Sequence, residues 1–85
     1  MISYLQGVSR SISPEEHETR RRIAARLRQA RKRIEQTLQA SGDRAGVTIF
    51  TWRRYETAQA SIPAEVLPRV ARAVETTCRA LLRVA

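Results

Sequence analysis

The sequence predicts an all-α fold, a compact bundle of about five helices. Three observations predict it. Apolar residues recur at the spacing of a helix face, residues that favour helix N-termini precede several of these runs, and no segment alternates between apolar and polar residues for long enough to form a strand. The chain has 85 residues, of which 42% are hydrophobic, and this suffices for one small core. Because such a core is marginal, dimerisation would help to stabilise it.

The first predicted helix runs from about residue 14 to about residue 35. Ser13 can act as its N-cap, Pro14 suits its first position, and Glu16 completes a Ser-x-x-Glu capping box. The apolar stripe along this helix consists of Ile23, Leu27, Ala30 and Ile34.

Two short helices joined by a tight turn are predicted between about residues 37 and 57. Thr37 can N-cap the first of them, which ends near Arg44. Gly46 can adopt the positive φ that reverses the chain, and Thr48 can N-cap the following helix. A helix, a glycine-containing turn and a second helix are the layout of a helix-turn-helix.

Two further helices complete the predicted bundle. Pro63 is expected to open the fourth helix, although Pro68 would bend its first turn or delay its start. Thr77 can N-cap the last helix, whose apolar residues are Cys78, Leu81 and Leu82.

The helix over residues 49–57 has two distinct faces when its residues are placed at about 100° intervals. The outward face carries an aromatic ring and two guanidinium groups, on Phe50, Arg53 and Arg54. Such a face suits the major groove of DNA, where Arg can read guanine and an apolar group can touch the methyl group of thymine. The other face can pack inward and holds Thr48, Ile49, Trp52, Tyr55 and Glu56.

The charge of the chain points to an anionic partner. Lys and Arg number 16 against 8 Asp and Glu, which gives a net charge of +8. Half of these cations lie within residues 20–33. We expect some of them, Arg21, Arg22, Arg26 or Arg28, to contact phosphate groups, which dominate affinity for nucleic acids.

Several other classes of protein are disfavoured. No apolar run is long enough to span a membrane, and the N-terminus lacks the pattern of a secretory signal. Cys78 is the single cysteine, so no intrachain disulfide can form, and we expect it to be a small buried apolar residue. His17 has no partner at metal-ligand spacing, so we expect a surface residue, no metal and no cofactor. No catalytic arrangement is evident, and an enzyme is not expected.

From about Arg22 to Leu82 the chain resembles the Cro/phage-repressor (xenobiotic-response-element type) helix-turn-helix family. The resemblance depends on the order and spacing of several short motifs. They are Arg-Leu-Arg-Gln-Ala-Arg at 26–31, Ala-Gly-Val-Thr at 45–48, Arg-Tyr-Glu at 54–56, Ile-Pro-Ala-Glu-Val-Leu-Pro at 62–68, Ala-Arg-Ala-Val at 71–74 and Leu-Leu at 81–82.

The resemblance implies a five-helix domain whose third helix enters the major groove, here with an N-terminally extended first helix. Residues 1–12 carry scattered apolar residues with Ser and Gly between them, and we interpret them as an arm or a short extra element that precedes the domain at residues 13–85. By position, Thr48 matches a phosphate-contacting cap. Among the residues of the recognition helix, those that match contacts to base edges are Ile49, Phe50 and Arg54, and Arg53 matches a further DNA contact. Arg31 and Glu56 match a partly buried ion pair, and Trp52 matches a core residue.

The chain also departs from the family pattern. Leu38 stands where the family commonly has a phosphate-binding Gln, and the loop at 58–61 lacks a basic residue. The other departures are Ser41 in place of Leu, Gly42 in place of Ala, and Glu35 and Glu75 in place of Gly.

These observations predict a cytoplasmic transcriptional regulator, a repressor that binds a pseudo-palindromic double-stranded DNA operator as a homodimer. The expected dimer interface consists of Leu81, Leu82 and Val84. Two alternatives stay open. One is an antitoxin-like or other protein-interaction module that also autoregulates, and the other is an RNA-binding protein that uses the Arg-rich first helix.

Overall fold

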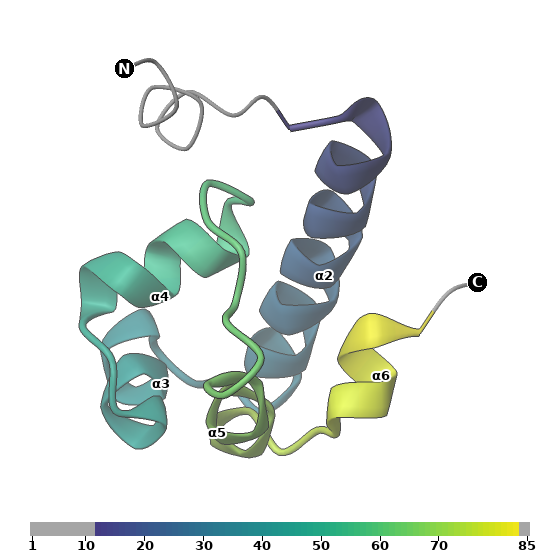
Figure 1. Cartoon of the computed structure of the whole chain (residues 1–85). Helices are drawn as coiled ribbons and strands as arrows, with labels where there is room; N and C mark the ends of the chain where they lie inside the picture. The colour runs from purple at the N-terminus through teal and green to yellow at the C-terminus, as the bar shows by residue number, and fades with distance from the viewer. Residues whose placement is uncertain (1–11, 84–85) are drawn as a thin grey trace.

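The computed structural model describes residues 12–83 and contains five helices in this range, with no strand. The long helix α2 lies between α3 and α4 on one side and the short α6 on the other, and α5 contacts both α3 and α6 (Figure 1). The all-α prediction is therefore confirmed. The helices are α2 (Pro14–Arg33), α3 (Leu38–Ala45), α4 (Ile49–Glu56), α5 (Leu67–Ala73) and α6 (Cys78–Leu82).

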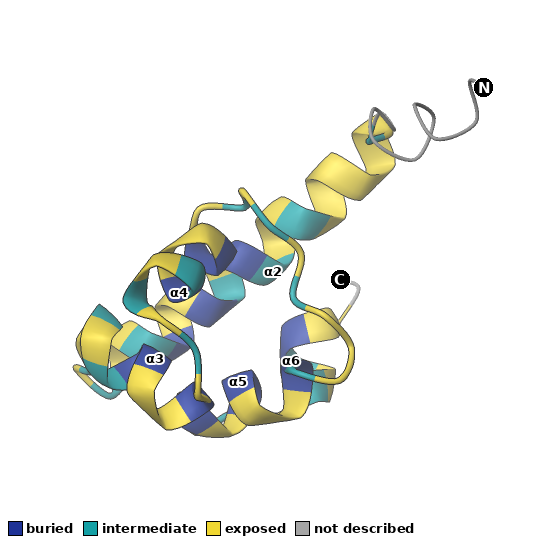
Figure 2. Cartoon of the chain, turned by 60° about the vertical axis from the view of Figure 1, so that its left-hand side comes forward, coloured by how far each residue is buried: buried dark blue, intermediate teal, exposed yellow. Residues whose placement is uncertain are grey.

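Helix α2 begins at Pro14, the position that the capping residues predict. The Ser13 hydroxyl accepts a hydrogen bond from the Glu16 backbone N–H at 3.1 Å, and the Glu16 carboxylate accepts one from the Ser13 N–H at 2.9 Å. The helix ends at Arg33, about two residues earlier than expected, because the chain turns into the left-handed region at Glu35, with φ +54°. The N-terminal part of α2 projects from the body of the molecule and is largely exposed (Figure 2).

The helix-turn-helix forms as the sequence predicts. The Thr37 and Thr48 hydroxyls cap α3 and α4, and Gly46 between the two helices has φ +77°. The turn also passes close to Gly42, which is buried in α3: a Cβ at this position would lie 3.0 Å from the Val47 carbonyl oxygen. This close approach gives a physical reason for glycine at a position where the resemblance implies alanine.

The fourth predicted helix begins later than Pro63. Pro63 belongs to a turn, in which its carbonyl oxygen accepts hydrogen bonds from Val66 N and Leu67 N, and α5 begins at Leu67. The delay follows from Pro68, because proline fits the first turn of a helix but in a helix interior would clash with the preceding turn. At the last helix, Thr77 caps α6 as predicted.

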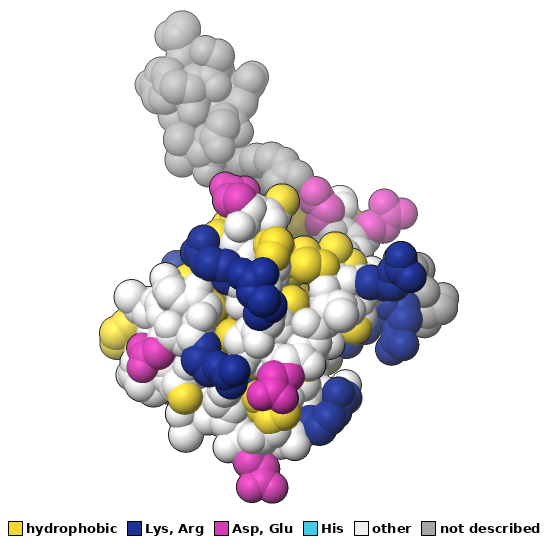
Figure 3. All heavy atoms as spheres, turned by 90° about the horizontal axis from the view of Figure 1, so that it is seen from below, with side chains coloured by type: hydrophobic (Ala, Val, Ile, Leu, Met, Phe, Trp, Pro, Cys, Tyr) yellow, Lys and Arg dark blue, Asp and Glu magenta, His cyan; other side chains and the backbone are white. Residues whose placement is uncertain are grey.

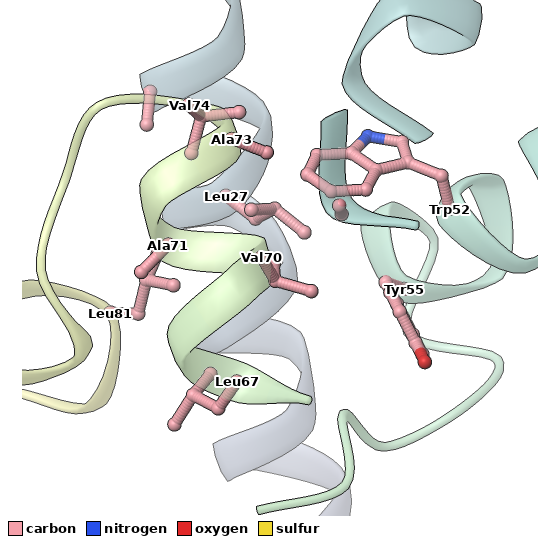
Figure 4. Packing of buried hydrophobic residues seen from close by; sticks show 11 residues of the cluster. Leu27, Trp52, Tyr55, Leu67, Val70, Ala71, Ala73, Val74 and Leu81 are labelled. Atoms are coloured by element: carbon pink, nitrogen blue, oxygen red, sulfur yellow. The ribbon is translucent and has the colours of Figure 1, made fainter. Parts of the chain in front are cut away.

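The core lies where the five helices meet, with Ala45 as the contribution of α3. Trp52 is fully buried, as predicted, and with Tyr55 it faces the side chains of α2 and α5 (Figure 4). Cys78 is only partly buried and packs against the edge of this core. The core consists of Leu27, Ala30, Ala45, Trp52, Tyr55, Leu67, Val70, Ala71, Ala73, Val74 and Leu81.

Candidate nucleic-acid interface

The outward face of α4 presents one large apolar side chain and two basic ones. Phe50 is 75% exposed, which makes it the most exposed large hydrophobic residue in the range 12–83. Arg53 and Arg54 are also exposed, and neither forms an ion pair with another described residue. An aromatic ring and two uncommitted guanidinium groups therefore point away from the core on a single helix.

The N-terminal end of α4 adds a shallow hollow beside Phe50. Ile49 is half-buried at this hollow, while the Thr48 hydroxyl accepts a hydrogen bond from the Thr51 N–H at 3.1 Å. The opposite wall comes from α3, where the Gln39 side-chain amide donates to the Asp43 carboxylate at 3.0 Å. The hollow therefore combines apolar and polar groups where α3 and α4 meet.

Sequence reasoning did not identify Gln39 and Asp43 as members of this surface. They are four residues apart, so they lie on one face of α3 and can interact. That spacing is a usable signal, but only the packing of α3 against α4 shows that this face borders the hollow. Asp43 places an acceptor of hydrogen bonds beside Phe50 and Thr48.

A buried ion pair fixes the orientation of α4. Arg31 of α2 donates to Glu56 twice, from Nε to Oε2 at 2.5 Å and from Nη2 to Oε1 at 3.0 Å. Trp52 Nε1 donates to the same carboxylate at 2.6 Å, and Arg31 Nη1 donates to the Gln36 carbonyl at 2.8 Å. The side chains of Arg31 and Glu56 are only 14% and 4% exposed. The pair implied by the resemblance is therefore present, and it ties α4 to α2.

A second polar cluster surrounds Ser41, the position at which the resemblance implies a leucine. Ser41 is fully buried, and its hydroxyl accepts from Gln36 Nε2 at 2.6 Å and donates to the Thr37 carbonyl at 2.9 Å. Gln36 Nε2 also donates to the Ala73 carbonyl at 2.8 Å, while Arg44 donates to the Gln36 side-chain oxygen. Hydrogen bonds therefore join α3 to the end of α5, and Gln36 was not predicted to do this.

The arginines of α2 occupy two different environments. Arg21 and Arg22 are exposed, and both reach Glu18, at 2.7 Å and 3.3 Å. Arg21 beside Glu18 lowers the pKa of that carboxyl, and Arg22 adds to the effect. Arg26 is half-buried and donates to the Leu81 carbonyl of α6 at 3.1 Å. Arg26 therefore helps to hold α6 through one of its N–H groups, and its predicted contact with phosphate stays a prediction.

The two described residues of the expected dimer interface differ in how far they are buried. Leu81 is 1% exposed and belongs to the core of its own chain, so its side chain offers no surface to a second copy. Leu82 is 47% exposed. Val84 lies outside the described residues. Of the two that the structure describes, Leu82 is therefore the accessible one.

Charged side chains are distributed in separate groups over the face drawn in Figure 3, with hydrophobic side chains between them. No group of three or more His, Cys, Asp or Glu residues that could hold a metal ion occurs in residues 12–83. His17 lies exposed near the start of α2. None of the helices in this part of the chain is long and apolar enough to cross a membrane.

Comparison with known proteins gives one family match. The model of a helix-turn-helix domain family matches residues 22–84, which begins within α2 and includes all the elements that build the α4 surface. No curated protein and no solved structure matches the chain significantly.

Proposed function

Because the chain belongs to the helix-turn-helix domain family, we propose that it is a sequence-specific DNA-binding transcriptional regulator. The observation that carries the proposal is the exposed face of α4, where Phe50, Arg53 and Arg54 project from a helix that is anchored from behind. A helix held this firmly can enter a major groove without losing its orientation.

The proposed contacts follow from the chemistry of each side chain. Arg53 and Arg54 suit bidentate hydrogen bonds to guanine, and Phe50 suits the methyl group of thymine. Thr48 and the free N–H groups at the start of α4 suit a backbone phosphate. The Thr48 hydroxyl donates to Thr51 Oγ1 at 3.0 Å in the free protein, so it has to rotate to donate to a phosphate. Ile49, which is half-buried at the hollow, is the further candidate for a contact with a base edge.

We further propose that the regulator is a cytoplasmic repressor, which acts by occupying its operator as a homodimer. Two copies of α4 would then enter successive major grooves about 34 Å apart on a pseudo-palindromic site. Leu82 is the described residue that supports such a seam, because it exposes an apolar side chain on α6. Arg21 and Arg22 remain candidates for general attraction to phosphate, in competition with Glu18.

Selection from randomised DNA duplexes tests the proposal directly. We expect a two-fold symmetric winning sequence, and we expect the protein to bind it more tightly than scrambled duplex or RNA across a salt series. Preferred binding to RNA would instead support recognition by the Arg-rich α2. A winning sequence without two-fold symmetry would contradict the homodimer.

Substitutions then locate the reading surface. Arg54→Ala should weaken operator binding by about 1–3 kcal/mol and relax preference at one base position. Arg79→Ala is the matched control, because Arg79 is an exposed arginine on α6, which lies across α2 from α4. Arg21→Ala should weaken specific and non-specific DNA equally. If Arg53→Ala and Arg54→Ala bind the operator as tightly as Arg79→Ala, α4 is not the reading helix.

A further inference from the structure

A groove with a mixed apolar and polar lining opens beside the projecting N-terminal part of α2, and the outward face of α4 does not account for it. Its volume is about 470 Å³, within the range of about 300–1,000 Å³ that is usual for pockets that bind small molecules. It is therefore large enough to bury several apolar side chains. The apolar lining comes from four helices and the loop between α4 and α5, as Ile23, Tyr55, Ile62, Leu67 and Leu82.

Two features of this groove indicate that another segment binds in it. Leu82 at its edge is 47% exposed, and the cost of leaving an apolar side chain in water falls when another apolar group covers it. Arg20 also lines the groove, and its Nε is the one buried side-chain polar atom in the described range that has no hydrogen-bond partner. Buried N–H groups are normally paired, so this donor indicates an acceptor that comes from outside residues 12–83.

The chain itself enters beside this groove. Ser13 caps α2, and Glu15 and Thr19 in the following turns line the groove. Eleven residues precede Ile12, and they can span up to about 36–40 Å when extended. Ile23, which lines the groove, lies ten residues along α2 from Ser13, a distance of about 15 Å. The whole groove is therefore within reach of residues 1–11.

The composition of residues 1–11 complements the groove. They include Ile2, Tyr4, Leu5 and Val8, which supply apolar side chains for an apolar lining. They also include Arg10, which is opposite in charge to Glu15 in the lining of the groove. Every peptide unit of the segment carries a carbonyl oxygen that could accept from Arg20 Nε.

We propose that, in the protomer before it dimerises, residues 1–11 dock in this groove of their own chain, with Tyr4 and Leu5 against Ile23, Ile62 and Leu82 and a backbone carbonyl on Arg20 Nε. Leu82 also supports the proposed dimer seam, so a second copy has to displace this one contact. Attachment to α2 favours the same chain over a second copy. A tethered segment meets its site at an effective concentration of about 1 mM, whereas a second copy at micromolar concentration is far more dilute.

Nuclear Overhauser effects between the Tyr4 ring and the methyl groups of Ile23, Ile62 and Leu82 test the contact in the full-length free protein. We expect them in a sample at micromolar concentration. Isotope-filtered spectra of a mixture of labelled and unlabelled protein distinguish contacts within one molecule from contacts between two molecules. Effects that appear only between labelled and unlabelled molecules would overturn docking in the same chain, and the absence of any effect would overturn docking altogether.

Substitutions outside the helical core give a second measurement. Tyr4→Ser combined with Leu5→Ser should lower the thermal midpoint by about 4 °C or more, the shift expected when a small domain loses a modest apolar contact. Ser3→Ala combined with Gln6→Ala is the matched control in the same segment and should leave the midpoint unchanged. If both double variants unfold at the same temperature as the parent, the groove does not hold this segment.

Discussion

Replacing Arg31 with Met should destabilise the protein far more than the loss of a surface charge. The substitution removes two hydrogen bonds to Glu56 and one to the Gln36 carbonyl, and it leaves a carboxylate that is 4% exposed with Trp52 Nε1 as its remaining donor. Breaking a buried pair by removing one partner costs about 3–5 kcal/mol, because the other charge stays buried and uncompensated. For a domain of this size the thermal midpoint should fall by about 12 °C or more.

Thermal unfolding followed by circular dichroism measures the effect, and two companion variants make it specific. Arg31→Met combined with Glu56→Gln removes both charges but keeps a side-chain oxygen for Trp52 Nε1, so it should recover at least half of the loss. Arg22→Met is the matched control, since it removes an exposed arginine from the same helix at an ion pair with 47% and 48% exposed side chains. It should hardly change the midpoint.

The reasoning fails if Arg31→Met unfolds within a few degrees of Arg22→Met. It also fails if the double variant is as unstable as the single one, because the cost would then come from lost packing of the arginine stem rather than from a stranded carboxylate. Either result would mean that the ion pair does not determine how firmly α4 is held.

Three further predictions concern the backbone and the projecting end of α2. Glu35→Gly should stabilise the fold by up to about 1 kcal/mol in urea titration, since Glu35 has φ +54° and the relief of a left-handed conformation exceeds the entropic cost of glycine; a destabilised variant would contradict this. Gly42→Ala should cost about 1 kcal/mol, because the new Cβ would lie 3.0 Å from the Val47 carbonyl oxygen; an unchanged unfolding midpoint would show that the turn can yield. The pKa of Glu18, which Arg21 lowers, should rise towards its ordinary value in Arg21→Gln, as measured by NMR titration. Because the folded pKa is the depressed one, any stabilisation from this carboxylate is present above the pKa of an unfolded glutamate and is lost as the pH falls through the folded value.

Local signals predicted most helix boundaries correctly, and tertiary packing explains the exceptions. Ser13, Thr37, Thr48 and Thr77 each cap a helix as expected, because a capping hydrogen bond involves residues only two or three positions apart. The start of α5 was misplaced, since Pro63 and a proline five residues later send competing local signals.

The candidate site was harder to predict than the helices that carry it. Periodicity showed that Trp52 faces inward and that Phe50 faces outward. It did not show that Arg26 turns towards the Leu81 carbonyl, because a long side chain chooses among partners that only the assembled fold supplies. Nor did it reveal that Gln36 satisfies a buried serine hydroxyl in α3, which requires three elements to meet.

The burial of Leu81 has a consequence for how such a regulator would respond to its own abundance. Since this side chain belongs to the core of a single chain, its own burial requires no second copy, which favours a protomer that folds before it dimerises. A proposed dimer would then assemble from a pool of folded but individually weak binders. Occupancy of the operator would rise with the square of the protomer concentration when dimers are scarce, which sharpens the threshold at which the promoter closes.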